Sequence, residues 1–397
     1  MLKVWFSSSL AVLGSVMLGL AVLAPNMAQA RTSTSGIEPA VPNEEEIPIA
    51  ILVDLSSGQI LHERNADRRF IPASITKVMT TFLAFEMLES GEAERSQTFT
   101  IRPETFQQWS RKGSTMFLPH DARLTFDQLL HGITTVSAND ASIVLAEGLA
   151  GSVPEWAAMM NAKALEIGMV NSHFTTPNGW PDDGQTFVTA RDLAILARAM
   201  TDRHPEEYAH FVGKREYSFG GITQPNRDPL LGRVRGADGI KTGFTNEAGF
   251  GFVGSALRDG TRLVMVVAGA DRTSIRDRAA RAYMEWGFAA FERRFLFGRD
   301  ETIFSARVQG GDASTVKLVS ASRIYAAIPD GASGDISVQL HYNGPLRAPI
   351  DKGETVAELA VLVDGMPTSR IPLVAGDRVE RANGLRRLIN GLVGWVS

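Results

Sequence analysis

A serine and a lysine stand three positions apart at the start of an apolar segment, IPASITKVMTTFLAFEML, residues 71–88. The apolar positions recur near helical spacing at Val78, Met79, Phe82, Leu83, Phe85 and Leu88. This spacing predicts a buried helix that begins close to Pro72 and carries Ser74 and Lys77 one turn apart on one face. An amine in that position can take the proton of the hydroxyl, provided that burial or nearby positive charge lowers its pKa from about 10.4.

Spacing alone does not identify a catalytic pair, because a serine near a helix start is commonly a cap. Ser314 and Lys317 repeat the same spacing within the segment STVKLVSASRIYAAI. The β-branched and alternating residues of that segment predict a strand, with no hydrophobic helix behind it. The choice between Ser74 as a nucleophile and Ser74 as a cap therefore depends on the rest of the chain.

Two further motifs could supply the remaining groups of such a site. Ser137 and Asn139 form the only Ser-x-Asn in the chain, directly before the helical pattern ASIVLAEGLAG. Lys241, Thr242 and Gly243 form the only Lys-Thr-Gly, inside the strand-like run GIKTGFT. Each motif alone has an ordinary explanation, a helix cap for the first and a solvated lysine with a bulge glycine for the second. The three motifs occur in the order SxxK, SxN and KTG, each on the expected kind of element. Together they form a specific set, although each motif alone is not specific.

This ordered set resembles the signature of the penicillin-binding protein and serine β-lactamase superfamily. The chain looks like a D-alanyl-D-alanine carboxypeptidase among its low-molecular-mass members. The likeness covers nearly everything after the first residues, including PASITKVMT, KGSTMFL, SANDASIVLAEGLAG, HFTTPNGWPDDG, DGIKTGFTNEAG and APIDKGETVAEL. One departure is Phe244, where many relatives have histidine, and this change bears on pH response or substrate contacts.

The resemblance implies a serine peptidase that removes the terminal D-alanine from peptidoglycan pentapeptides and that also binds β-lactams, without a metal or cofactor. Ser74 would attack the carbonyl between the two terminal D-alanines, and Lys77 would be its general base. Ser137 would relay a proton to the leaving amine. Asn139 would hydrogen-bond the substrate amide and hold Lys77 in place.

The same resemblance assigns substrate contacts to the third motif. Lys241 and Thr242 would receive the free carboxylate of the substrate, with Arg227 as the alternative contact. Gly243 would let the peptide backbone lie against the strand. The backbone N–H groups of Ser74 and Phe244 would form the oxyanion hole, where each donor is worth about 3 kcal/mol.

The elements that position these motifs predict an α+β fold over residues 47–300. Alternating runs around Ser57 predict a β-hairpin, helical patterns follow it, and strand-like runs return around Asp259. One sheet built from remote segments and covered by helices follows from this order, and the resemblance implies a β-lactamase/transpeptidase-like domain. Residues 301–379 are rich in Val, Ile, Thr and Gly and predict a small all-β domain.

The two ends of the chain indicate export and a membrane surface. Residues 1–30 combine a charged start, an apolar middle and a small-residue cleavage site, which predicts a secretory signal peptide, with an uncleaved anchor as the alternative. Residues 31–46 predict a flexible leader. Residues 380–397 predict an amphipathic helix with a basic face, which suits an anionic membrane surface or, alternatively, packing on its own domain or on a second subunit. We therefore expect a periplasmic protein attached peripherally to the inner membrane.

The composition of the chain argues against disulfide bonds, nucleic-acid binding and metal binding. The chain has no cysteine, so an exported form must rest on its hydrophobic core without disulfides. A net charge of −4 without a long basic run argues against nucleic acid as a partner. The seven histidines are scattered without metal-ligand spacing, so we expect no metal.

Two other functions share these motifs. A class A β-lactamase deacylates with a carboxylate in an ExxxN loop, and the nearest match is Glu166 with Asn171, which is one residue too long and ends a helical pattern. A non-catalytic wall-binding protein or β-lactam sensor would acylate and stay acylated. Intact motifs do not reveal a deacylation rate, so the sequence does not exclude the sensor function.

Overall fold

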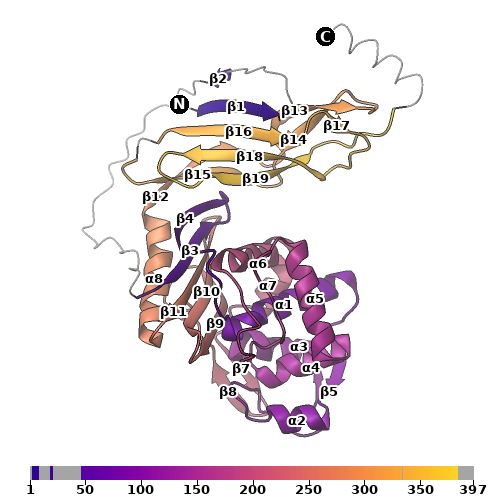
Figure 1. Ribbon diagram of the computed structural model, residues 1–397, viewed down its shortest axis with the longest axis vertical. Coiled ribbons are helices and arrows are strands. Elements are labelled where there is room, and N and C mark those ends of the chain that lie inside the picture. Colours follow the sequence, from indigo (N-terminus) through magenta and orange to yellow (C-terminus); the bar gives the residue numbers. More distant parts are fainter. Residues whose placement is uncertain (1, 9–17, 21–45, 333, 383–397) are drawn as a thin grey trace. The chain divides into compact units, whose positions relative to one another are not determined.

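A computed structural model describes residues 2–8, 18–20, 46–332 and 334–382 of the 397-residue chain (Figure 1). These residues form two compact units. One unit, called the helix-rich unit here, comprises residues 46–53 and 62–289. The other, called the β unit, comprises the remaining described residues.

The helix-rich unit is built on a five-stranded sheet with the strand order β4-β3-β11-β10-β9. The strands are β3 (Ile49–Asp54), β4 (Gln59–Arg64), β9 (Ala237–Thr245), β10 (Gly249–Arg258) and β11 (Thr261–Ala270). Asp259 and Gly260 join β10 to β11 with φ angles of 50° and 81°, the two positive values that a tight two-residue hairpin requires. The sheet confirms the prediction that remote segments of the chain pair with one another.

Helices cover this sheet on both faces (Figure 1). They are η1 (Ala73–Thr76), α1 (Lys77–Ser90), α2 (Pro103–Trp109), α3 (Phe126–His131), η2 (Gly132–Val136), α4 (Asn139–Ala150), α5 (Val153–Glu166), α6 (Ala190–Arg203), α7 (Pro205–Phe211) and α8 (Thr273–Ala289). α8 packs on β10 and β11, while α6 packs on β11 within the helical cluster. Two small two-stranded sheets complete the unit, β5 (Thr98–Thr100) with β6 (Arg123–Thr125), and β7 (Glu216–Phe219) with β8 (Ile222–Pro225).

The first long helix, α1, is buried on almost every side. Its apolar side chains Val78, Phe82 and Phe85 are at most 2% exposed. Burying such a side chain fully stabilises the fold by about 1.5–3 kcal/mol. The helix ends at Gly91, whose φ of 77° provides the left-handed C-terminal residue that glycine adopts readily. The predicted buried helix is confirmed, and it forms a rigid support for the residues at its start.

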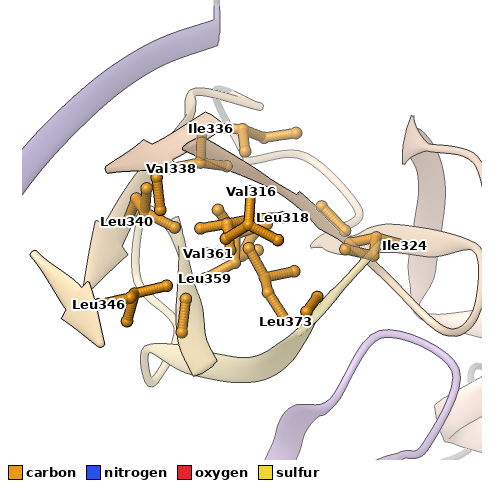
Figure 2. Packing of buried hydrophobic residues seen from close by; sticks show 14 of the residues in the cluster. Val316, Leu318, Ile324, Ile336, Val338, Leu340, Leu346, Leu359, Val361 and Leu373 are labelled. Carbon is orange, nitrogen blue, oxygen red and sulfur yellow. The ribbon is translucent and has the colours of Figure 1, made fainter. Parts of the chain in front are cut away.

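The β unit consists of strands in its described residues, which confirms the predicted all-β domain. Its strands are β12 (Phe291–Phe297), β13 (Thr302–Gln309), β14 (Thr315–Val319), β15 (Ile324–Pro329), β16 (Ile336–Tyr342), β17 (Leu346–Arg347), β18 (Thr355–Val363) and β19 (Ser369–Ala375). Alternate residues point inward, so that Val338, Leu359 and Leu373 meet in a core shown in Figure 2.

β12 pairs with β15, and the other strands form an eight-stranded sheet in the order β17-β13-β14-β19-β18-β16-β1-β2. In it, β1 (Leu2–Ser8) runs parallel to β16, and β2 (Leu18–Leu20) pairs with β1. Both strands fall within the predicted signal peptide, and cleavage after Ala30 would remove them from the mature protein. The predicted leader, apart from Glu46, lies outside the described residues, as does residue 383 onward of the predicted C-terminal helix. Among the described residues, none of the helices is long and apolar enough to cross a membrane.

Candidate active site

Ser74 lies in η1, a short 3₁₀ turn directly before α1. The turn opens at Ala73, whose φ of 49° falls in the left-handed region. A Cβ atom on Gly179 would lie 1.8 Å from the carbonyl oxygen of Ala73, so only glycine permits this contact. The segment around Gly179 therefore fixes the backbone that carries Ser74. Lys77 is the first residue of α1, so the pair spans a 3₁₀ turn and a helix start, where the sequence predicted one continuous helix.

The amine of Lys77 is enclosed, with 1% of the residue exposed. Nζ lies 3.0 Å from Ser74 Oγ, 2.8 Å from Asn139 Oδ1 and 2.7 Å from the carbonyl oxygen of Asn178. The two carbonyl oxygens can only accept hydrogen bonds, so they occupy two N–H groups of Lys77. A neutral amine then has its lone pair available for the hydroxyl proton of Ser74. This arrangement suits a general base.

The surroundings favour the neutral form of Lys77. Burial lowers its pKa well below the usual value, the charge on Lys241 lowers it further, and Asp140 opposes the shift. Burial also lowers the pKa of Lys241, to about 7, and the charges of Arg227 and Arg276 act in the same direction. Burial and the nearby positive charges therefore favour the neutral form of Lys77 that a general base requires.

Ser137 and Asn139 lie where η2, a π-helical turn, gives way to α4. Ser137 has a φ of 64°, a left-handed conformation that costs a residue other than glycine about 1–2 kcal/mol. Asn139 accepts a hydrogen bond from Lys77 and donates one from Nδ2 to the carbonyl of Lys112 at 3.0 Å. The second motif therefore contacts the first, and hydrogen bonds hold both the oxygen and the nitrogen of the Asn139 side-chain amide.

The Lys-Thr-Gly motif and Phe244 follow one another along β9, the edge strand of the sheet. A Cβ atom on Gly243 would lie 2.5 Å from the carbonyl oxygen of Pro72, which immediately precedes η1. The missing side chain of Gly243 therefore admits the turn that carries Ser74. The sequence analysis gave this glycine a contact with substrate alone, and the close approach of the chain to itself is an additional requirement.

A cleft of about 790 Å³ joins the three motifs. Its lining includes the predicted residues Ser74, Ser137, Asn139, Arg227, Thr242, Gly243 and Phe244. Lys77 and Lys241 lie behind the cleft wall, where they are 1% and 6% exposed. Lys241 Nζ donates to the carbonyl oxygen of Thr242 at 2.9 Å. A ligand in the cleft would therefore meet the hydroxyl and backbone of Thr242 before the amine of Lys241.

Two arginines add positive charge to the cleft lining. Arg227 donates from Nη1 to Ser114 Oγ at 2.6 Å. Arg276, which is 4% exposed, pairs with Asp277 at 2.6 Å and donates to the carbonyl of Gly251 at 3.3 Å. No sequence pattern indicates Arg276, because it lies on α8 in a helix pattern that contains several arginines and no catalytic motif. The charge of these side chains suits a cleft that receives an anionic group.

Asp140 is a second residue that the sequence analysis left out of the site. Its carboxylate is buried and accepts the N–H of Met116 at 3.0 and 3.1 Å and that of Leu118 at 3.4 Å. Burial raises the pKa of Asp140 although these N–H groups oppose the shift. The carbonyl of Ser114, in the same segment, accepts the N–H of Asn139 at 2.7 Å. Asp140 thus links residues 112–118 (KGSTMFL) to the start of α4. Its position directly after Asn139 is the sequence feature that could have pointed to this role.

Glu166, the nearest match to the carboxylate of a class A β-lactamase, is not part of the described lining of the cleft, and the acidic residue in that lining, Asp277, is paired with Arg276 at 2.6 Å. Glu166 ends α5 with a side chain that is 51% exposed, and it pairs with Lys163 at 2.6 Å and with Arg203 at 3.2 Å. Glu166 is therefore a surface ion-pair residue, and the geometry gives no support to the β-lactamase alternative.

The second Ser-x-x-Lys match has no such surroundings. Ser314 directly precedes β14, and Lys317 lies on that strand in the β unit. The Lys317 side chain is 58% exposed and lies 3.5 Å from an oxygen of Asp377. Lys317 thus lacks the enclosure that surrounds Lys77, so the surroundings of this pair do not resemble those of a general base.

Comparison with protein families gives two adjacent matches. Residues 38–272 match the family described as D-alanyl-D-alanine carboxypeptidase. Residues 291–381 match the family described as the C-terminal domain of penicillin-binding protein 5.

Individual relatives match most of the chain. It is 34% identical to D-alanyl-D-alanine carboxypeptidase DacC of Escherichia coli over 85% of each chain. It is 32% identical to DacA of Haemophilus influenzae over 86% of this chain and 88% of that one. Among solved structures, penicillin-binding protein 5 from Haemophilus influenzae superposes with a TM-score of 0.73 at 32% identity, over 86% of this chain and 100% of that one. Penicillin-binding protein D2 from Listeria monocytogenes, in its ampicillin-bound form, superposes with a TM-score of 0.56 at 29% identity, over 62% of this chain and 100% of that one.

Proposed function

The chain belongs to the D-alanyl-D-alanine carboxypeptidase family, and from that premise we propose that Ser74 is the nucleophile of this serine-type carboxypeptidase. The observation that carries the assignment is the position of Lys77 Nζ, within 3.0 Å of three oxygens. Of these three oxygens, the hydroxyl of Ser74 is the one that has a proton to give. Lys77 is accordingly the base.

Acylation starts when Ser74 Oγ attacks the carbonyl of the penultimate D-alanine and its proton passes to Lys77 Nζ. The backbone N–H groups of Ser74 and Phe244 stabilise the developing oxyanion, each by about 3 kcal/mol. The C–N bond then breaks, and the amine of the terminal D-alanine takes a proton through Ser137. Water later attacks the ester carbon, which releases the shortened peptide and returns the proton to Ser74.

The free carboxylate of the substrate is the group that distinguishes a chain terminus from an internal peptide bond. We place it at Thr242 and Lys241, with Arg227 as the alternative contact, because Thr242 and Arg227 line the cleft and the amine of Lys241 lies directly behind Thr242. Arg276, which also lines the cleft, adds a further positive charge. Asn139 binds the amide of the substrate while it holds Lys77.

β-lactams acylate the same serine. Their strained amide presents a carbonyl to Ser74, and their carboxylate would bind at Thr242 and Lys241, as the carboxylate of the substrate does. The relative from Listeria monocytogenes that was solved in an ampicillin-bound form supports this use of the fold.

The location of the enzyme is also a proposal. Residues 1–30 direct export to the periplasm and are removed, and residues 380–397 attach the mature enzyme to the inner membrane surface. The apolar stripe and basic face of the C-terminal sequence support the second step. Attachment of this kind would place the cleft near the wall precursors that carry pentapeptides.

The test of the catalytic assignment is release of D-alanine from a pentapeptide that ends in D-Ala-D-Ala. Ser74→Ala should abolish both this release and labelling by fluorescent penicillin, whereas the matched control Ser314→Ala should retain both. Labelling that persists in Ser74→Ala would refute the assignment. A chase of the label separates enzyme from sensor: rapid loss of label with peptide turnover means enzyme, and label that stays without turnover means sensor.

A further inference from the structure

Asp127, His131 and His210 bring three metal-binding side chains together on the helix-rich unit, outside the lining of the catalytic cleft. Asp127 and His131 lie four positions apart on α3, and His210 lies in the last turn of α7. One ligand atom from each residue lies within 4.8 Å of the other two. Two helices that are distant in the sequence thus converge on one small volume.

The separations suit a single small ion. His210 Nε2 lies 2.8 Å from Asp127 Oδ1, and His131 Nε2 lies 3.7 Å from Asp127 Oδ2. Ligand atoms around a tetrahedral ion with bonds of about 2.0–2.1 Å lie roughly 3.3 Å apart. The two distances end on different oxygens of Asp127, and one ligand atom from each of the three residues lies within 4.8 Å of the other two, so side-chain movements toward this separation would complete the coordination.

Aromatic packing holds the two imidazoles in place. His131 stacks on Tyr217, with ring centroids 5.7 Å apart and planes at 20°, and it also packs on Phe211 at 4.9 Å. His210 meets Phe211 edge-on at 4.5 Å. Tyr217 is itself anchored, because its hydroxyl donates to a backbone carbonyl of α3 at 3.2 Å. Fixed rings lose little freedom on binding an ion, as a preformed site requires.

The site is also reachable from solvent, and the nearby cations are engaged elsewhere. The side chains of His131, Asp127 and His210 are 17%, 36% and 39% exposed, so an ion could enter and retain water. The cations near His131 have other partners: Arg95 pairs with Glu207 at 2.7 Å, and the amine of Lys214 donates to a backbone carbonyl at 3.0 Å.

We propose that Asp127, His131 and His210 form a binding site for a divalent transition-metal ion, with Zn²⁺ as the ion that these ligands suit best. Two imidazoles, one carboxylate and one water make a tetrahedral zinc site, whereas Mg²⁺ and Ca²⁺ require mainly oxygen ligands. The ion ties α3 to α7, and α3 continues through η2 directly into Ser137. Its role is to stabilise this part of the fold, independently of the peptidase chemistry.

The first experiment titrates zinc chloride into the full-length protein, purified in detergent and treated with a chelator, by isothermal calorimetry above the usual pKa of histidine. We expect one equivalent to bind, and no binding of magnesium chloride. Zinc at a hundred times its dissociation constant should raise the midpoint of thermal unfolding by about 5 °C or more. Failure of the wild type to bind zinc would overturn the proposal.

The second experiment removes one ligand at a time. Asp127→Asn, His131→Gln and His210→Gln should each weaken zinc binding by about 100-fold or more. The matched control is His120→Gln, because His120 forms an exposed pair with Asp121 at 2.5 Å and is not part of the cluster. Zinc affinity unchanged in all three ligand variants would refute the site.

A third measurement does not depend on how well the variants fold. Anomalous scattering at the zinc edge from wild-type crystals should place the ion between α3 and α7. A bound zinc ion elsewhere in the molecule would contradict the assignment.

Discussion

Discrimination between a free terminal carboxylate and its amide should fall as pH rises through about 7, because burial, with Arg227 and Arg276, lowers the pKa of Lys241 to about 7. Below this pH the ammonium can attract the carboxylate, and above it the attraction is lost. A charge-assisted hydrogen bond is worth about 1.5–3 kcal/mol, which corresponds to about ten- to a hundredfold in kcat/KM. The base Lys77 acts on both substrates alike, so the ratio of the two rates isolates the carboxylate contact.

The assay measures D-alanine release from two peptides that differ only in a terminal acid or amide, across a pH series. Since kcat/KM reports the free enzyme, the midpoint of the change in the ratio gives the pKa of unliganded Lys241. Lys241→Gln should lower the ratio and remove its pH dependence. Lys317→Gln is the matched control, because Lys317 is exposed in the β unit and should leave the ratio unchanged.

The opposite result would locate the carboxylate elsewhere. A Lys241→Gln enzyme that loses activity while keeping the full ratio would show that Lys241 does not bind the carboxylate. Arg227, which lines the cleft, would then be the first residue to replace, followed by Arg276. A ratio that is independent of pH in the wild type would likewise refute the argument from the pKa of Lys241.

Two further predictions concern the turn that carries the nucleophile and the C-terminal sequence. Gly243→Ala should slow penicillin acylation by about 100-fold, because a Cβ atom 2.5 Å from the carbonyl oxygen of Pro72 must displace the turn of Ser74; an acylation rate close to wild type would contradict this. A chain that ends after Ala382, whose N–H donates to Gly310 and completes the described β unit, should keep full peptidase activity and no longer sediment with anionic vesicles. Equal sedimentation of both forms would exclude the tail as the anchor.

Much of the fold could be predicted because it depends on local periodicity. The apolar spacing after Ser74 predicted a buried helix, and the alternation around Ser57 predicted the hairpin of β3 and β4, since both patterns repeat within a few residues. The sequence predicted that remote segments share one sheet, but it did not predict the order of the strands. That order depends on contacts between distant segments, such as the pairing of β3 with β11. The 3₁₀ turn at Ser74 was not predicted, since it depends on the close approach of Gly179 to Ala73.

The site residues that belong to short sequence motifs could be predicted. The structure brings Ser74, Ser137 and the Lys-Thr-Gly strand together around one cleft. Arg276 and the carbonyl of Asn178 contribute through position alone, and an isolated arginine or a backbone oxygen gives no pattern in the sequence. The Asp127 cluster was missed for a similar reason, because His210 lies 83 positions away from Asp127.

The central claim is that peptide hydrolysis passes through an ester on Ser74, and rapid quenching of the enzyme during pentapeptide turnover tests it most directly. Mass spectrometry of the quenched and digested protein should find the acyl group of the shortened peptide on the fragment that contains Ser74. The same treatment of Ser74→Ala should give no adduct and no D-alanine. An adduct on another residue, or full turnover by Ser74→Ala, would contradict the account.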